Sequence, residues 1–266
     1  MEQAQDFLDE SEALHGLVAP LSDIELKRPT AFKGWTINDV IGHLHVWNHA
    51  ADLTLTDEAA FDGFMGEVSG AVRGGTLNAF EKQWLDGLSG SALVAAWRGR
   101  FSEVAENYGS ADPSARVKWA GPDMSARSSI TARLMETWAH GQEVYDVLGV
   151  TRKNTDRIRN IVILGVNTYG WTYKTRGEDP PGPMPFVTLT APSGATWEYG
   201  DRQGGNVIEG AAEEFCQVVT QTRNIADTGL AVRGAIAADW MAKAQCFAGP
   251  PEAPPAPGTR TINRMS

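Results

Sequence analysis

The chain has 266 residues, 42% of them hydrophobic and 21% charged, a composition typical of a soluble globular protein with one large domain or two ordinary ones. Its formal net charge of −10 argues against nucleic acid and anionic membranes as partners, because both attract basic proteins. Two cysteines, an N-terminus without a signal-peptide pattern and no uncharged apolar run of about 18 residues predict a cytoplasmic protein without disulfides or a membrane span.

Hydrophobic residues recur at helical spacing through the first 150 residues. Thr36 stands where an N-cap is expected, and Asp39 three residues later resembles a capping box. Three glycines within 70–75 are expected to interrupt the helical pattern, and Gly149 is the expected C-cap of the last helix. The pattern predicts helices over 3–18, 36–56, 57–68, 76–87, 90–108 and 128–148. We therefore predict an all-helical bundle over residues 1–150.

The pattern changes after residue 150, where strand-like alternation and proline-rich turns appear. Strands are predicted over 186–190, 196–199 and 230–232, and helices over 155–174, 207–221 and 235–246. We predict an α+β fold class, with a smaller α/β domain over 151–248 following the helical bundle. The tail over 249–266 is rich in proline and is expected to be extended coil.

One pair of residues in the last bundle helix has the spacing of a metal site. Glu136 and His140 are four residues apart, a helical rotation of about 400°, so both side chains project from one face. On the helix that follows Thr36, a helical wheel places His43 at the edge of the apolar stripe, whereas His45 and His49 point away from it. His43 would complete a ligand set of two imidazoles and one carboxylate, which leaves metal positions open for water or substrate.

Simpler explanations exist for each of these residues. His43 could be a histidine at the edge of the core, hydrogen-bonded to a neighbour. Glu136 and His140 could form an ordinary helical pair at the surface. His45 and His49 are expected to be solvated.

Two longer segments carry a resemblance to a known family. They are Gly34-Trp-Thr-Ile-Asn-Asp-Val-Ile-Gly-His-Leu and Met135-Glu-Thr-Trp-Ala-His-Gly-Gln-Glu-Val-Tyr-Asp-Val-Leu-Gly. Together they resemble the mycothiol-dependent maleylpyruvate isomerase family of the DinB/YfiT-like superfamily, whose members are metal-binding four-helix bundles. The C-terminal half is similar to an actinobacterial metal-binding subset of that superfamily, whose small α/β C-terminal domains are related to sterol-carrier-like folds.

The resemblance implies a function and a set of site residues. It implies His43, Glu136 and His140 as ligands of a divalent metal, usually zinc, and mycothiol as a cosubstrate. The expected protein is a metal-dependent isomerase or transferase that activates this thiol, or water, for addition to a small electrophilic substrate. Arg223 is our candidate for holding a substrate carboxylate, the alternative being a surface or interdomain salt bridge. Trp47 could line the pocket and contact the cofactor, although core packing is the simpler role.

Two other classes of function stay open at the level of sequence. One is a metal-dependent lyase or hydrolase that acts on a small hydrophobic molecule without a thiol. The other is a non-catalytic protein whose C-terminal domain holds an apolar ligand. In each case the expected partner is a small molecule, and the sequence is also compatible with a homodimer.

Overall fold

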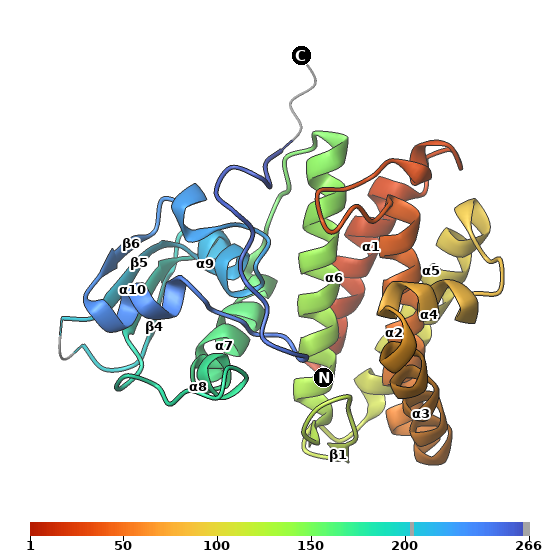
Figure 1. The fold of residues 1–266 in the computed structure, drawn as a ribbon, viewed down its shortest axis with the longest axis horizontal. Helices are drawn as coiled ribbons and strands as arrows, with labels where there is room; N and C mark the ends of the chain where they lie inside the picture. Colours follow the sequence, from red (N-terminus) through yellow and green to blue (C-terminus); the bar gives the residue numbers. More distant parts are fainter. Residues whose placement is uncertain (203–204, 263–266) are drawn as a thin grey trace. The chain divides into compact units, whose positions relative to one another are not determined.

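The computed structural model describes residues 1–202 and 205–262 of the chain. Contacts divide the chain into two compact units, Met1–Leu148 and Gly149–Ser266. In the described part of the chain, no helix is both long and apolar enough to cross a membrane. The predicted α+β class is confirmed, since the first unit is helical and the second contains a sheet (Figure 1).

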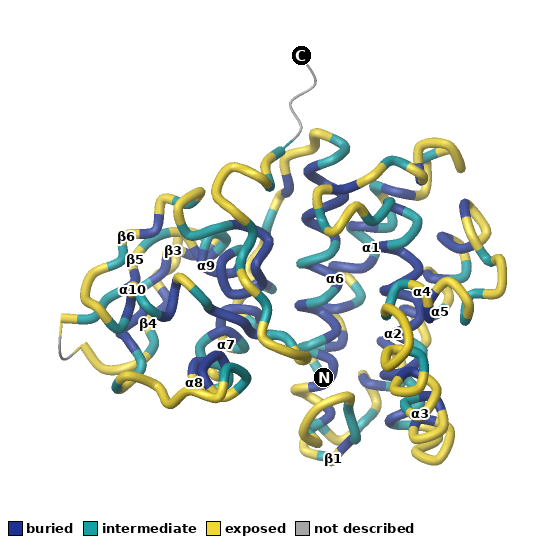
Figure 2. Tube along the Cα trace, in the orientation of Figure 1, coloured by how far each residue is buried: buried dark blue, intermediate teal, exposed yellow. Residues whose placement is uncertain are grey.

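The N-terminal unit is built on four long helices that pack against one another. These are α1 (Glu2–Val18), α2 (Ile37–Thr56), α5 (Gly90–Ser110) and α6 (Ala126–Leu148). Their inward faces share one apolar core, in which the side chains of Phe7, Leu44, Trp97 and Leu134 have no exposed surface. Buried residues follow the inner sides of these helices in Figure 2. Burial of apolar surface, worth about 25 cal/mol per Å², is what joins the helices into a bundle.

Two further helices cover one side of α2. They are α3 (Glu58–Gly74) and α4 (Leu77–Trp84), which contact α2 and each other. A second apolar cluster forms there from Val46, Trp47, Ala50, Phe64 and Phe80, among others. The unit also contains a 3₁₀ turn, η1 (Glu25–Lys27), and a two-stranded ribbon of β1 (Arg116–Val117) and β2 (Met124–Ser125).

The C-terminal unit contains a four-stranded sheet in the order β4-β3-β5-β6. Its strands are β3 (Phe186–Thr190), β4 (Thr196–Tyr199), β5 (Val207–Ala211) and β6 (Ala231–Arg233). β3 pairs in parallel with β5, and the other two pairings are antiparallel. Its helices are α7 (Arg159–Asn167), α8 (Tyr169–Lys174), α9 (Ala212–Val219) and α10 (Ala235–Met241), with 3₁₀ turns η2 (Asp156–Ile158) and η3 (Ile225–Asp227).

The structure corrects several predicted boundaries. Residues 207–211 were predicted as the start of a helix but form β5, because they pair with both β3 and β6 and the helix begins only at Ala212. α3 continues through the glycines to Gly74. The helix predicted over 155–174 divides at Thr168, whose backbone leaves the helical region and whose hydroxyl donates to Leu164 O at 2.7 Å. β1 and β2 were not predicted, since strands of two residues carry no periodicity.

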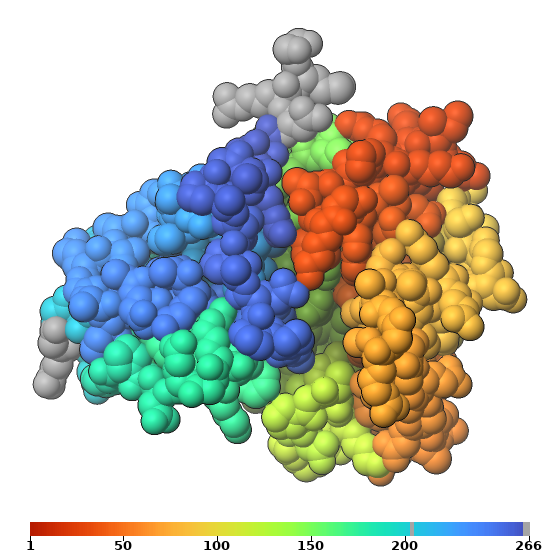
Figure 3. Space-filling view, in the orientation of Figure 1, coloured from red at the N-terminus to blue at the C-terminus, as the bar shows by residue number. Residues whose placement is uncertain are grey.

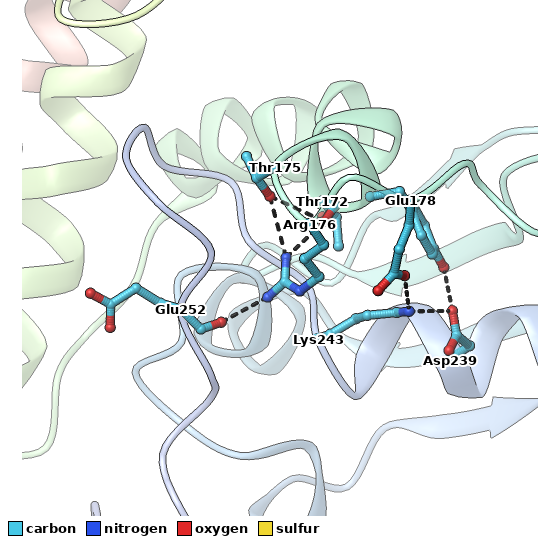
Figure 4. A network of polar contacts seen from close by, with 8 residues as sticks. Thr172, Thr175, Arg176, Glu178, Asp239, Lys243 and Glu252 are labelled. Carbon is cyan, nitrogen blue, oxygen red and sulfur yellow. Dashed lines mark hydrogen bonds and ion pairs between the residues drawn. The ribbon is translucent and has the colours of Figure 1, made fainter.

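Residues 249–262 of the proline-rich tail lie against the rest of the C-terminal unit (Figure 3), and residues 263–266 are outside the described part of the chain. Carbonyl groups of this segment accept hydrogen bonds from Arg176 at Glu252 O and from Asn224 at Pro255 O. Figure 4 shows that the guanidinium of Arg176 also binds Thr172 O, while Lys243 bridges Glu178 and Asp239. These cations are therefore occupied in holding the segment and neighbouring helices in place.

Candidate metal centre

Three side chains from two helices converge inside the N-terminal unit. His43 projects from α2, and Glu136 and His140 project from α6. Their potential ligand atoms all lie within 4.8 Å of one another. Glu136 Oε2 is 3.6 Å from His43 Nε2 and 3.3 Å from His140 Nε2. The three residues predicted as a ligand set are thus brought together by the fold.

A capping box defines where α2, the helix that carries His43, begins. Thr36 and Asp39 form the predicted capping box, in which Asp39 N donates to Thr36 Oγ1 at 3.1 Å and Thr36 N donates to Asp39 Oδ2 at 2.9 Å. Such a cap stabilises a helix by about 1 kcal/mol. Gly42 precedes His43, and a Cβ there would lie 2.8 Å from Leu85 Cδ1. The missing side chain therefore lets the end of α4 approach α2 closely.

A fourth residue, Glu81 of α4, contacts the ring nitrogen of His43 that does not face Glu136. Its Oε1 atom lies 2.7 Å from His43 Nδ1 and accepts a hydrogen bond from Trp47 Nε1 at 2.9 Å. A metal-binding histidine almost always donates its second ring nitrogen to such a partner, which fixes the tautomer and the ring. In this arrangement Nε2 of His43 is left facing Glu136. The donor set and its support fit a divalent metal site.

Sequence reasoning missed Glu81, although a signal was present. Leu77, Glu81 and Trp84 follow the i, i+4, i+7 spacing of one helix face. A carboxylate among aromatic and aliphatic residues on an apolar face needs a partner, because burying an unpaired charge costs several kcal/mol. Trp47, predicted to line the pocket, donates to this carboxylate and is 8% exposed. Its predicted contact with a cofactor stays a prediction.

The electrostatics of the cluster favour an ionised carboxylate. Burial raises the pKa of Glu136, but hydrogen bonds and charge from His140 and His43 outweigh it and hold this pKa far below its usual range. Burial lowers the pKa of His43, yet Glu81 and Glu136 outweigh burial and raise it to about 9. Burial, assisted by the charge on His43, lowers the pKa of His140. Because a histidine ligand must be neutral, an entering metal would displace the proton from His43.

Aromatic rings enclose the histidines on one side. Trp35 stacks on His140 with ring centroids 6.0 Å apart and an interplanar angle of 6°, and Phe32 meets the same ring edge-on at 5.1 Å. Both aromatics belong to a tight loop in which Lys33 and Gly34 have positive φ angles of 52° and 71°. An apolar wall of this kind limits water access and strengthens electrostatic interactions within a site.

The prediction that His45 is solvated was wrong, and His49 is only partly exposed. His45 is 8% exposed, and the rings of His45 and His49 lie 6.0 and 5.1 Å from that of Trp84. Burial lowers the pKa of His45 to about 4 and also lowers that of His49. The wheel assumed one buried face on α2, whereas α3 and α4 bury a second face.

Arg223 belongs to the C-terminal unit, where it follows α9 and is buried. Its Nη1 atom donates to Thr222 O at 2.8 Å. The predicted contact of Arg223 with a substrate carboxylate stays a prediction. Cys216 and Cys246 are buried and not paired in a disulfide.

Comparison with known proteins identifies the family. Residues 7–145 match the family model described as Mycothiol maleylpyruvate isomerase N-terminal domain, which includes every residue of the candidate metal centre. The chain belongs to this family. Two uncharacterized proteins from two strains of Mycobacterium tuberculosis are each 39% identical to it over 247 residues, covering 92% of this chain and 95% of the relative.

Solved structures share the fold of this family member. A crystal structure of the mycothiol-dependent maleylpyruvate isomerase matches with a TM-score of 0.55 and 15% identity, over 82% of this chain and 87% of that chain. The structure of a histidine-to-alanine mutant of that isomerase matches with a TM-score of 0.52, at the same identity and coverage. The resemblance noted in the sequence is therefore confirmed at the level of family and fold.

Proposed function

We propose that this protein is a mycothiol-using enzyme of the isomerase or transferase type, with a divalent metal held by His43, Glu136 and His140. The observation that carries the proposal is the convergence of these three side chains with Glu81 behind His43. Two imidazoles and one carboxylate suit zinc and leave at least one coordination position open. The use of mycothiol rests on membership of the family.

A bound metal would supply Lewis acidity, which lowers the pKa of a coordinated thiol and yields a nucleophile near neutral pH. The protein's own residues prepare the site for this. Glu81 holds His43 in one orientation and one tautomer. Phe32 and Trp35 keep bulk water from one side of the histidines.

The proposed reaction is addition of the thiolate to an activated alkene of a small electrophilic molecule. The thiolate sulfur forms a bond to one alkene carbon, and the π electrons of the alkene move onto the activating group as an enolate. The two carbons are then joined by a single bond, about which rotation is free. Departure of the thiolate then restores the double bond in the other geometry, with no net change in atoms. If the enolate instead takes up a proton from solvent before the sulfur departs, the product is a stable thioether and the protein acts as a thiol transferase.

Mycothiol titration into zinc-loaded protein tests the proposal. We expect mycothiol to raise the melting temperature of the zinc-loaded wild type, because a ligand that binds only the folded state stabilises it. Glu136→Gln, which removes the anionic ligand at nearly constant shape, should abolish this rise. A matched control is His49→Gln, which changes a histidine of α2 outside the predicted ligand set. Zinc binding without any response to mycothiol would favour a thiol-independent hydrolase or lyase and overturn the thiol part of the proposal.

A further inference from the structure

A second buried ionic group lies beside the candidate metal centre. Arg133 of α6 is 1% exposed, and its Nε atom donates to Asn48 Oδ1 on α2 at 3.0 Å. It precedes Glu136 by three residues and His140 by seven, and so lies roughly 5 to 10 Å from the centre along the helix axis. Arg133 and the predicted ligands therefore share one face of α6.

The guanidinium of Arg133 has no carboxylate of its own. Within the described ranges of the chain, its Nη2 atom has no hydrogen-bond partner, and neither do Asn48 Nδ2 and Glu81 Oε2. No ion pair is found for it among the described residues, while Glu136 and Glu81 act on it through space. Burial lowers the pKa of Arg133 to about 10, so it keeps its charge at neutral pH. Burying an arginine that makes one hydrogen bond lowers the stability of the folded protein unless nearby charges compensate for its desolvation.

The charges around the candidate metal centre indicate a role for Arg133. Glu81 and Glu136 contribute two negative charges and Arg133 one positive charge, with both histidines neutral as ligands. The protein thus offers a divalent metal one net negative charge, and the loaded site keeps one net positive charge. Without Arg133 the loaded site would be neutral.

We propose that Arg133 is a positioning residue that makes the loaded metal centre selective for a monoanionic ligand, such as a thiolate, over a neutral one. This inference rests on the metal site of the proposed function. It specifies that the ligand at the open coordination position of the metal carries one negative charge. Through its positive charge, Arg133 lowers the affinity of the site for the metal ion and raises the affinity of the loaded site for the anion. Those two effects have opposite signs.

The opposite signs distinguish this role from a structural one. At an effective dielectric constant near 20, a unit charge about 8 Å away changes the affinity for a monoanion by roughly thirtyfold. Removing it should lower anion affinity by at least about tenfold and raise affinity for a divalent ion by more than that factor. A variant that only loosens the packing between α2 and α6 would lower both affinities.

The experiment uses the full chain loaded with Co²⁺, whose visible absorption reports on its ligands. Azide is the anionic probe, and Co²⁺ affinity is measured by chelator competition. We expect Arg133→Met to lose azide affinity and gain Co²⁺ affinity, and Arg133→Lys, which keeps the charge, to stay within about threefold of wild type. If Arg133→Met does not fold, Arg133→Gln, which is able to donate to Asn48, replaces it.

Each outcome decides between the alternatives. A fall in both affinities, or unchanged affinities in the charge-removing variants, would overturn the inference while leaving the metal site in place. A wild type that binds no Co²⁺ would overturn the metal site itself. If azide behaves as expected but mycothiol does not bind, the charge role of Arg133 stands and the thiol assignment falls.

Discussion

The support that Glu81 gives to His43 predicts a measurable loss of metal affinity when it is removed. Glu81 Oε1 accepts from Trp47 Nε1 at 2.9 Å and lies 2.7 Å from His43 Nδ1. Loss of a partner of this kind lowers metal affinity by about 10- to 100-fold, or about 1.4 to 2.7 kcal/mol. Glu81→Gln keeps an acceptor but removes the charge, so we expect the lower end of this range. Glu81→Ala removes both and should reach the upper end.

The assay is competition for zinc between the protein and a fluorescent chelator, with circular dichroism to confirm that each variant is folded. Trp47→Phe is the matched control, because it removes one hydrogen bond to Glu81 but leaves the contact with His43. We expect its zinc affinity to change by less than about threefold. Wild-type affinity in both Glu81 variants, or an equal loss in Trp47→Phe, would refute the role given to Glu81.

Further predictions concern the stability and accessibility of the chain. Thr36→Ala should lower the free energy of unfolding by about 1 kcal/mol in urea titrations, with Thr36→Ser near wild type; an unchanged midpoint in the alanine variant would contradict the capping box. Burial and the charge of Arg100, opposed by Asp52, lower the pKa of His49 in the folded protein below its value of about 6.5 in the unfolded chain. The unfolded state therefore binds more protons, and the free energy of unfolding should fall as the pH drops below about 6.5. His49→Gln should flatten this fall in the urea midpoint between about pH 7 and 5, and an equal slope in the variant would count against it. Burial raises the pKa of the Cys216 thiol, so a thiol reagent should label it only after denaturation, and rapid labelling of the native protein would contradict its burial.

Much of the architecture follows from sequence because it depends on local signals. The period of apolar residues defines α1, α2, α5 and α6, and the capping box fixes where α2 begins. Residues 207–211 were assigned to the wrong type of element because β5 is defined by its pairing with β3 and β6, which are distant in sequence. A strand of five residues leading directly into a helix carries no local boundary signal.

The distinction between local signals and contacts distant in sequence also explains which residues of the site could be predicted. Glu136 and His140 share one helix, so their spacing alone puts them on one face, and the edge of the apolar stripe selects His43. The spacing on α4 indicates that Glu81 lies on an apolar face, but its partner His43 lies across a helix interface, as does Asn48, the partner of Arg133. Spacing within one helix does not reveal such partners. His45 and His49 were misjudged for that reason, since a wheel shows one helix and not the helices that cover it.

The metal content of the purified protein is a direct test of the site formed by His43, Glu136 and His140. The measurement is moles of zinc per mole of chain by atomic emission, for wild type and His140→Ala, with His49→Ala as a matched histidine outside the predicted ligand set. We expect close to one equivalent in wild type and His49→Ala and almost none in His140→Ala. A metal-free wild type after zinc reconstitution, or a His140→Ala variant that keeps its full equivalent, would contradict it.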